Sequence, residues 1–236
     1  MTKMTVRARS IALLILATAT ACAAPAFADD DMPMNSARIG VYSVFYHVHT
    51  EGLSGPYVPE GTTIEAKNLR TLYLGYVRSL TTHFNLELTA GVPPLQKTIG
   101  RGPATLGSVP YNGQVIAEAR WLAPTLLLEY EFFGPQANFR PYIGVGVNYV
   151  NFYDRTSTPA GDAASGGPTR LSLTASVGVA GTVGMDYRIS GNWHAYASYS
   201  ASQVKTRLDA DTAGVERTAH INFGPQALVV AVGYSF

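Results

Sequence analysis

The side chains in this sequence that are best suited to chemistry are acidic and basic residues close to short polar turns. Seven of them stand at the alternate strand positions whose side chains share one face, which we call the inward parity: Arg38, Glu87, Glu129, Glu131, Arg140, Asp186 and His194. If that face turns into a narrow interior, the buried charges must pair with one another. We therefore expect the seven to form a polar plug near one end of the interior.

Catalysis and metal binding are less well supported by the residue pattern. Serine and histidine both occur, as in barrel enzymes that modify lipids, but no G-x-S-x-G motif singles out a nucleophile. His47 and His49 could share a strand face, yet no third metal ligand accompanies them. The glycines at 144 and 146 lie within a predicted strand rather than at a strand-to-helix turn, which argues against nucleotide binding. We expect no enzyme, no cofactor and no metal.

The elements that must position these residues are β-strands. From Leu171 to Tyr187 the odd positions are mostly apolar and the even positions small or polar, which is typical of a strand with two different faces. After residue 28 no apolar run is long enough for a membrane-spanning helix. Eight segments show the strand pattern, over residues 38–48, 63–78, 84–93, 115–133, 140–153, 171–187, 193–206 and 219–236.

The N-terminal segment has the features of a secretory signal. Three basic residues precede an uncharged run over residues 10–21, and Ala26-Phe27-Ala28 follows as a cleavage site. We expect residues 1–28 to be removed and residues 29–236 to form one domain. The only cysteine, Cys22, lies in the removed segment, although it could instead carry a lipid. The remaining charge is nearly balanced, so nothing here recruits nucleic acid.

The connections between the predicted strands alternate in length. Residues 50–61, 96–113, 154–170 and 207–218 form long loops, whereas residues 79–83, 134–139 and 188–192 form tight turns. This asymmetry is typical of an all-β, eight-stranded antiparallel barrel of the outer membrane with its termini at the periplasmic end.

The strands of a soluble barrel of the lipocalin type would also alternate between apolar and polar residues, with the apolar residues inside. Three features favour the membrane. The last strand carries Leu228, Val230, Val232, Tyr234 and Phe236 on one face, and the other face of the strands is rich in small residues. Aromatic residues also gather beside the short turns, as in an interfacial girdle: Tyr130, Phe132, Tyr187, Trp193 and Tyr234.

Several segments resemble the OmpW family of outer-membrane proteins. The segment from Phe139 to Tyr153, FRPYIGVGVNYVNFY, resembles the signature strand of that family, and Trp121-Leu122-Ala123-Pro124-Thr125-Leu126 resembles the strand before it. Gly184-Met185-Asp186-Tyr187 and the ending Gly233-Tyr234-Ser235-Phe236 are also similar. The resemblance implies a small barrel associated with the passage of small apolar molecules.

The inward positions near the long loops differ from the plug. Val44, Tyr46, Trp121, Val150 and Phe152 are predicted to form an apolar funnel. Because eight strands enclose little more than their own side chains, an apolar solute could not pass straight through the charged plug. We expect it to leave sideways between the third and fourth strands.

The prolines indicate where such an exit would lie. Pro93, Pro94 and Pro124 cannot donate to a β-ladder, and they stand on these two neighbouring strands near the long loops. They predict a lateral seam. The alternative is that the prolines merely end the ladder where the barrel rises above the membrane.

Three functions are compatible with these features. The first is a passive conduit for small hydrophobic molecules. The second is a structural or surface-interaction barrel whose loops bind phage, toxin or host factors, and the third is a lipid-modifying enzyme. The expected partners are outer-membrane lipids, small hydrophobic molecules and the barrel-assembly machinery, the last through the C-terminal Phe236. The expected state is a monomer in the outer membrane of a Gram-negative bacterium.

Overall fold

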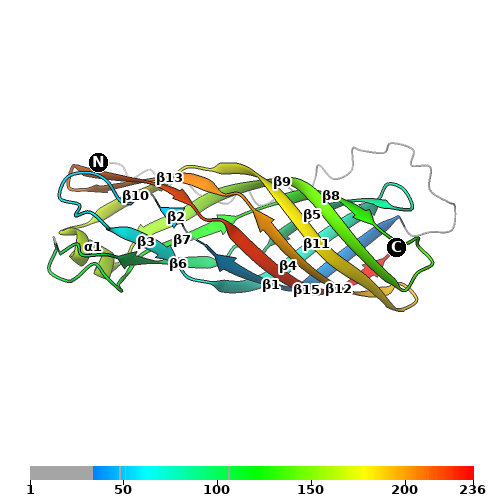
Figure 1. Cartoon of the computed structure of the whole chain (residues 1–236). Helices are drawn as coiled ribbons and strands as arrows, with labels where there is room; N and C mark the ends of the chain where they lie inside the picture. The colour runs from blue at the N-terminus through cyan, green and yellow to red at the C-terminus, as the bar shows by residue number, and fades with distance from the viewer. Residues whose placement is uncertain (1–33, 48, 51, 106) are drawn as a thin grey trace, which may run out of the picture.

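The eight predicted strands close into a ring in the computed structural model, which describes residues 34–236 except 48, 51 and 106. Each strand pairs antiparallel with the next, and β1 pairs with β15 from Ser36↔Ser235 onward, so the ring has no free edge. The prediction of an eight-stranded antiparallel barrel is confirmed (Figure 1). The predicted signal peptide lies outside the described residues. In ring order the strands are β1 (Asn35–Tyr46), β4 (Leu69–Ser79), β5 (Phe84–Gly91), β8 (Thr125–Glu131), β9 (Phe139–Ser157), β11 (Ser176–Ser190), β12 (Trp193–Ser202) and β15 (Pro225–Ser235).

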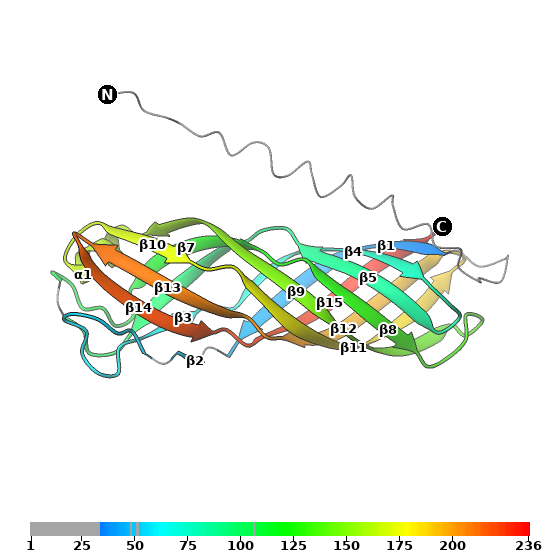
Figure 2. The same cartoon turned by 90° about the horizontal axis from the view of Figure 1, so that it is seen from above.

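An extension continues the barrel on the side of the long connections (Figure 2). It contains one helix, α1 (Pro159–Ser165), and shorter strands. The start of β1 and the end of β15 lie at the opposite end, together with the short turns (Figure 1). The strands of the extension are β2 (His49–Thr50), β3 (Thr63–Ala66), β6 (Leu95–Arg101), β7 (Val115–Leu122), β10 (Thr169–Leu173), β13 (Lys205–Thr212) and β14 (Val215–Asn222).

Two-residue breaks separate the extension from the barrel in five of the predicted strands, at residues 67–68, 123–124, 174–175, 203–204 and 223–224. The sequence pattern predicted these strands as continuous, and in this detail the prediction was wrong. The breaks let the pairing change, because above them the ring divides into the ladders β3-β6-β7-β9 and β2-β14-β13-β10. Strand β9 runs unbroken through both parts.

Three of the predicted long loops contain regular structure. Residues 96–113 include most of β6, which pairs with β3 and β7. Residues 207–218 form a hairpin, whose two-residue turn is made possible by positive φ angles at Ala213 (51°) and Gly214 (87°). Residues 154–170 hold α1, which begins where Thr158 accepts a hydrogen bond from Gly161 N and ends at Gly166 in the left-handed conformation.

The barrel wall has two chemically different faces. Large apolar side chains point outward along every ring strand, and Val145 and Val177 are 69% and 77% exposed. The five girdle aromatics are also exposed, and the rings of Trp193 and Tyr234 meet with centroids 5.2 Å apart. In the described part of the chain, no helix is long and apolar enough to cross a membrane. The outward face is therefore suited to lipid, and the inward face holds the candidate site.

Candidate functional site inside the barrel

The centre of the polar interior is Arg38, which projects from β1 into the lumen. Its Nη1 donates a 2.9 Å hydrogen bond to Oε1 of Glu87 on β5 and lies 4.0 Å from Oε2 of Glu129 on β8. The guanidinium also stacks on the ring of Tyr196, with Cζ 3.8 Å from its centroid. Tyr73 donates its hydroxyl to the same oxygen of Glu87. One arginine therefore lies between two buried acidic side chains.

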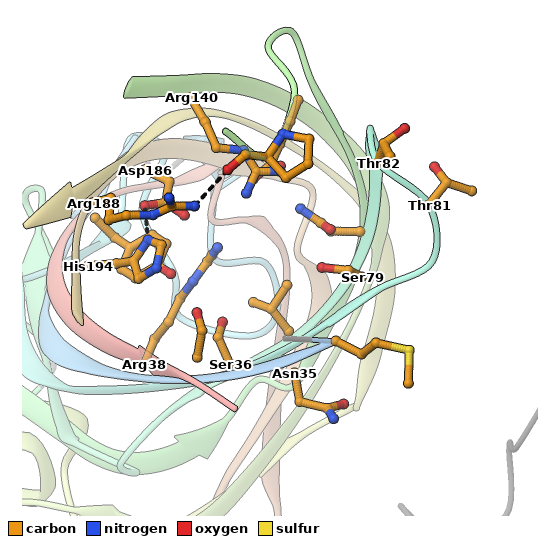
Figure 3. A pocket seen from close by; sticks show the side chains of 17 residues that line it. Asn35, Ser36, Arg38, Ser79, Thr81, Thr82, Arg140, Asp186, Arg188 and His194 are labelled. Carbon is orange, nitrogen blue, oxygen red and sulfur yellow. Dashed lines mark hydrogen bonds and ion pairs between the residues drawn. The ribbon is translucent and has the colours of Figure 1, made fainter. Parts of the chain in front are cut away.

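Two further contacts between acidic and basic side chains lie closer to the short turns. Arg140 on β9 pairs with Glu131 on β8, and Nδ1 of His194 lies 2.7 Å from Oδ1 of Asp186 across the β11–β12 ladder. Figure 3 shows this end: Arg38 points into the opening, Arg140, Asp186 and His194 gather on one side, and Thr81 and Thr82 stand on the other. The structure thus places all seven predicted plug residues in this half of the lumen, in three groups of acidic and basic side chains. We call them the ionic plug.

The apolar inward residues meet nearer the extension. Val44, Tyr46, Trp121, Val150 and Phe152 line a single cavity of about 510 Å³, part of it open to solvent. Val44 and Val150 are almost completely buried. We call this cavity the inner chamber. A smaller cavity of mixed lining shares Tyr42, Thr125 and Ser202 with the inner chamber and reaches Glu87, so the ionic plug lies beyond the chamber toward the short turns.

The predicted seam is a local break in the wall beside the inner chamber. The β5–β8 ladder ends at Thr89↔Thr125, and pairing resumes in the extension at Leu95↔Arg120. No ladder bonds therefore join residues 90–94 to residues 121–124, which face them. The first stretch contains Pro93 and Pro94, and the second contains Pro124. The loss of pairing is confined to the prolines: β6 and β7 pair above them because their backbone N–H groups are again free to donate.

Each lip of this break is held by its other neighbour. Val92 N donates to Leu72 O on β4, and Tyr149 N on β9 donates to Pro124 O. At the upper corner, Arg120 Nη1 donates a 3.1 Å hydrogen bond to Pro93 O. Gln96, Ala123 and Thr125 flank the break and also line the inner chamber. The break thus borders the inner chamber, and its lower end, at Thr89 and Thr125, also borders the cavity that reaches Glu87.

A second apolar cavity, the outer chamber, lies within the extension. It spans about 940 Å³ with its open mouth, and its walls come from the loop after β2, from α1 and from extension strands, with Ile64, Ile116 and Ile221 among the lining residues. Among the described residues, Phe223 alone lines both chambers. Its ring contacts Tyr46 (6.0 Å between centroids) and Phe152 (5.9 Å). Phe223 therefore forms the partition between the chambers.

Two of these residues escaped the sequence analysis although they follow the inward parity. Tyr73 is the largest side chain on the inward face of β4, and Phe223 is an aromatic that shares its parity with the inward Ala227 and Val229. In both cases an aromatic side chain at an inward position was the available signal. Arg217, which lines the outer chamber, fell in a segment predicted as loop.

The closed ring, the apolar outer face and the charged interior define this protein as a β-barrel of the outer-membrane type. The OmpW family model matches residues 37–236, and the chain belongs to this family. The chain is 32% identical over 165 residues to outer membrane protein W of Vibrio cholerae serotype O1, covering 70% of this chain and 72% of the relative. Its cellular location is the bacterial outer membrane.

Two other likenesses bear on fold and function. The crystal structure of OprG from Pseudomonas aeruginosa superposes with a TM-score of 0.78 at 21% identity, over 87% of this chain and 97% of that chain, and shows the same fold. The "dibenzothiophene metabolism operon protein PahQ" of Pseudomonas aeruginosa is 25% identical over 208 residues, which cover 84% of this chain and 87% of the relative.

The lumen contains one arrangement that a hydrolase could use. His194 and Asp186 form a buried pair, as in a catalytic triad. No recorded hydrogen bond of the described residues joins His194 to a serine, although Ser36 and Ser235 line the same opening. The relatives are outer-membrane proteins, and the described geometry supplies no activated nucleophile.

Proposed function

We propose that this protein is a passive conduit for small apolar molecules, which enter through the extension and leave sideways into the lipid of the outer membrane. The observation that carries the proposal is the position of the inner chamber. It is apolar, the ionic plug lies below it, and it borders the break between β5–β6 and β7–β8. An apolar solute in this chamber faces paired charges below and lipid at its side.

The energetics favour the sideways route. Moving an apolar solute past Arg38 and Glu87 would separate buried, hydrogen-bonded charges, which costs several kcal/mol. Leaving through the break exchanges one apolar environment for another, because the outward residues beside it, Leu88, Val92 and Leu126, are exposed to lipid. The relative PahQ adds support, since its name links it to the metabolism of dibenzothiophene, an apolar aromatic molecule.

Cross-linking across the break tests the route. Cysteines at Val92 and Leu122 stand on opposite lips, whereas cysteines at Leu88 and Leu126 join the same two strands where the ladder is intact. The sequence has no cysteine after Cys22. Both pairs are closed by a short thiol cross-linker, and dibenzothiophene uptake is measured in cells with and without the protein.

The proposal predicts that closing V92C/L122C abolishes uptake, whereas closing L88C/L126C leaves it unchanged. With a reducible linker, thiol addition should restore uptake. Uptake that survives the V92C/L122C cross-link would rule out the lateral route. Equal uptake in cells with and without the protein would rule out the conduit itself and favour the surface-interaction hypothesis.

A further inference from the structure

The outer chamber contains a buried cation that has no anionic partner among the described residues. Arg217 on β14 lines the chamber and is only 6% exposed. Its Nη1 donates to Thr212 Oγ1 (3.1 Å) and its Nε to Pro56 O (3.4 Å), both neutral acceptors. Within the described residues, no carboxylate oxygen lies within 4.0 Å of Arg217. Arg38, Arg101, Arg120, Arg140 and Arg207 all have such a carboxylate.

The other charges of the chamber do not balance Arg217. Glu118 lines the chamber but pairs with Lys97 at 3.6 Å. Arg155 also lines it and donates to Leu173 O. The remaining lining is largely apolar, with Ile64, Leu208 and Ile221 among its members. A buried charge in such surroundings is costly unless an opposite charge joins it. The chamber thus combines an apolar wall with an excess of positive charge.

A hydroxyl group stands near this charge. Tyr111 is buried in the same chamber, and no recorded hydrogen bond of the described residues engages its hydroxyl. Burial raises the pKa of Tyr111 above its ordinary value, although the nearby positive charge of Arg217 opposes the rise. The phenol therefore stays protonated at neutral pH and has a proton to donate. A guanidinium and a phenol are complementary to a carboxylate.

We propose that the outer chamber binds apolar monocarboxylic acids, with the carboxylate on Arg217 and Tyr111 and the hydrocarbon against Ile64, Leu208 and Ile221. The inference rests on the proposed function only in making this chamber the entrance of the conduit. It adds a solute class that the inner chamber, with its apolar lining, does not indicate.

A purely structural role for Arg217 makes a different prediction. Its bonds to Pro56 and Thr212 tie the loop after β2 to the β13–β14 hairpin. If this were its whole role, Arg217→Met would loosen the extension without distinguishing an acid from an alcohol. The discriminating measurement is therefore the preference for octanoate over 1-octanol, two probes with the same hydrocarbon length.

The test is a titration of the folded barrel in zwitterionic lipid nanodiscs at pH 8, with empty nanodiscs as blank and ¹³C-carboxyl-labelled octanoate followed by NMR. A charge-assisted hydrogen bond in a buried site predicts that the wild-type protein binds octanoate about tenfold or more tightly than 1-octanol. Arg217→Met should lose this preference and Arg217→Lys should keep part of it. Tyr111→Phe should weaken octanoate binding about threefold without affecting 1-octanol.

Arg155→Met is the matched control, because Arg155 lines the same chamber but bonds only to a backbone carbonyl. It should keep the preference. Equal affinity of the wild-type protein for the two probes would overturn the proposal, and so would a preference that survives Arg217→Met. If Arg217→Met does not fold, Arg217→Lys and Tyr111→Phe decide. An undiminished preference for octanoate over 1-octanol in both variants would then overturn the proposal. Equal dibenzothiophene uptake with and without the protein, together with a preference for octanoate, would refute the conduit alone. Protein-dependent uptake without that preference would refute the acid site alone.

Discussion

Arg38 and Glu87 meet across the lumen from β1 and β5, strands that are not neighbours in the ring, and their 2.9 Å contact is buried on both sides. Replacing Arg38 by Met leaves Glu87 and Glu129 without their cation. Removal of one member of a buried pair predicts a loss of about 3–5 kcal/mol in the free energy of unfolding. Urea unfolding in lipid bilayers measures it.

The control for this variant is Arg101→Gln, which breaks the exposed pair with Glu65. An exposed pair of this kind contributes at most about 1 kcal/mol, so the control should unfold nearly as the wild type does. Equal losses in the two variants would show that the ionic plug contributes no more than a surface pair.

The ring and the plug were accessible from the sequence because both follow from period-two alternation. Parity alone placed Glu87, Glu129 and Asp186 inside the lumen. The clustering of charged residues near the short turns indicated at which end of the barrel they lie. Parity says nothing about which inward residues touch. The choice of Glu87 rather than Glu129 as the partner of Arg38 depends on strand tilt and stagger, which no single strand encodes.

The extension was less predictable for a physical reason. A residue such as Leu95 or Lys97 has the same alternation whether it pairs with a neighbour or lies in a loop, and pairing depends on strands far away in sequence. The breaks at 174–175 and 203–204 carry no proline or glycine, so they left no local signal. The prolines at 93, 94 and 124 did mark the place where the β5–β8 ladder stops.

Glycine at position 146 is predicted to be indispensable for assembly. A Cβ added there would overlap the carbonyl oxygen of Leu126 on the paired strand. We expect Gly146→Ala to cost about 1–3 kcal/mol, read from unfolding in bilayers and from the yield of folded barrel. Gly181→Ala is the matched control in the adjacent strand, since its Cβ would meet no atom closer than 3.9 Å. A wild-type yield and stability for Gly146→Ala would contradict the β8–β9 register, in which Gly146 lies opposite Leu127.

Phe223 is predicted to limit passage between the two chambers. Opening the partition breaks its ring contacts with Tyr46 and Phe152, each worth about 1 kcal/mol. Phe223→Ala should therefore raise the initial rate of dibenzothiophene uptake about fivefold or more. Phe45→Ala removes an outward-facing ring and should leave the rate unchanged. A slower rate in Phe223→Ala would mean that the ring guides solutes instead of retarding them.

Occupation of the inner chamber should be visible in fluorescence, because the chain has two tryptophans in different environments. Trp121 lines the inner chamber, and Trp193 is exposed in the aromatic girdle. In a Trp193→Phe variant, a brominated alkane should quench Trp121 with saturation, as expected of a site. In the Trp121→Phe variant, quenching of Trp193 should rise without saturation as the alkane partitions into lipid. Identical quenching curves would argue against a binding cavity.

The ionic plug also bears on the permeability barrier of the cell. On the proposed route, a barrel whose lumen is crossed by buried acidic–basic pairs adds wall to the outer membrane without adding a wide water-filled hole. Such a barrel would give hydrophilic antibiotics and salts no entry, however many copies the membrane carries. The cell could then raise its uptake of sparingly soluble nutrients independently of its tolerance to water-soluble poisons.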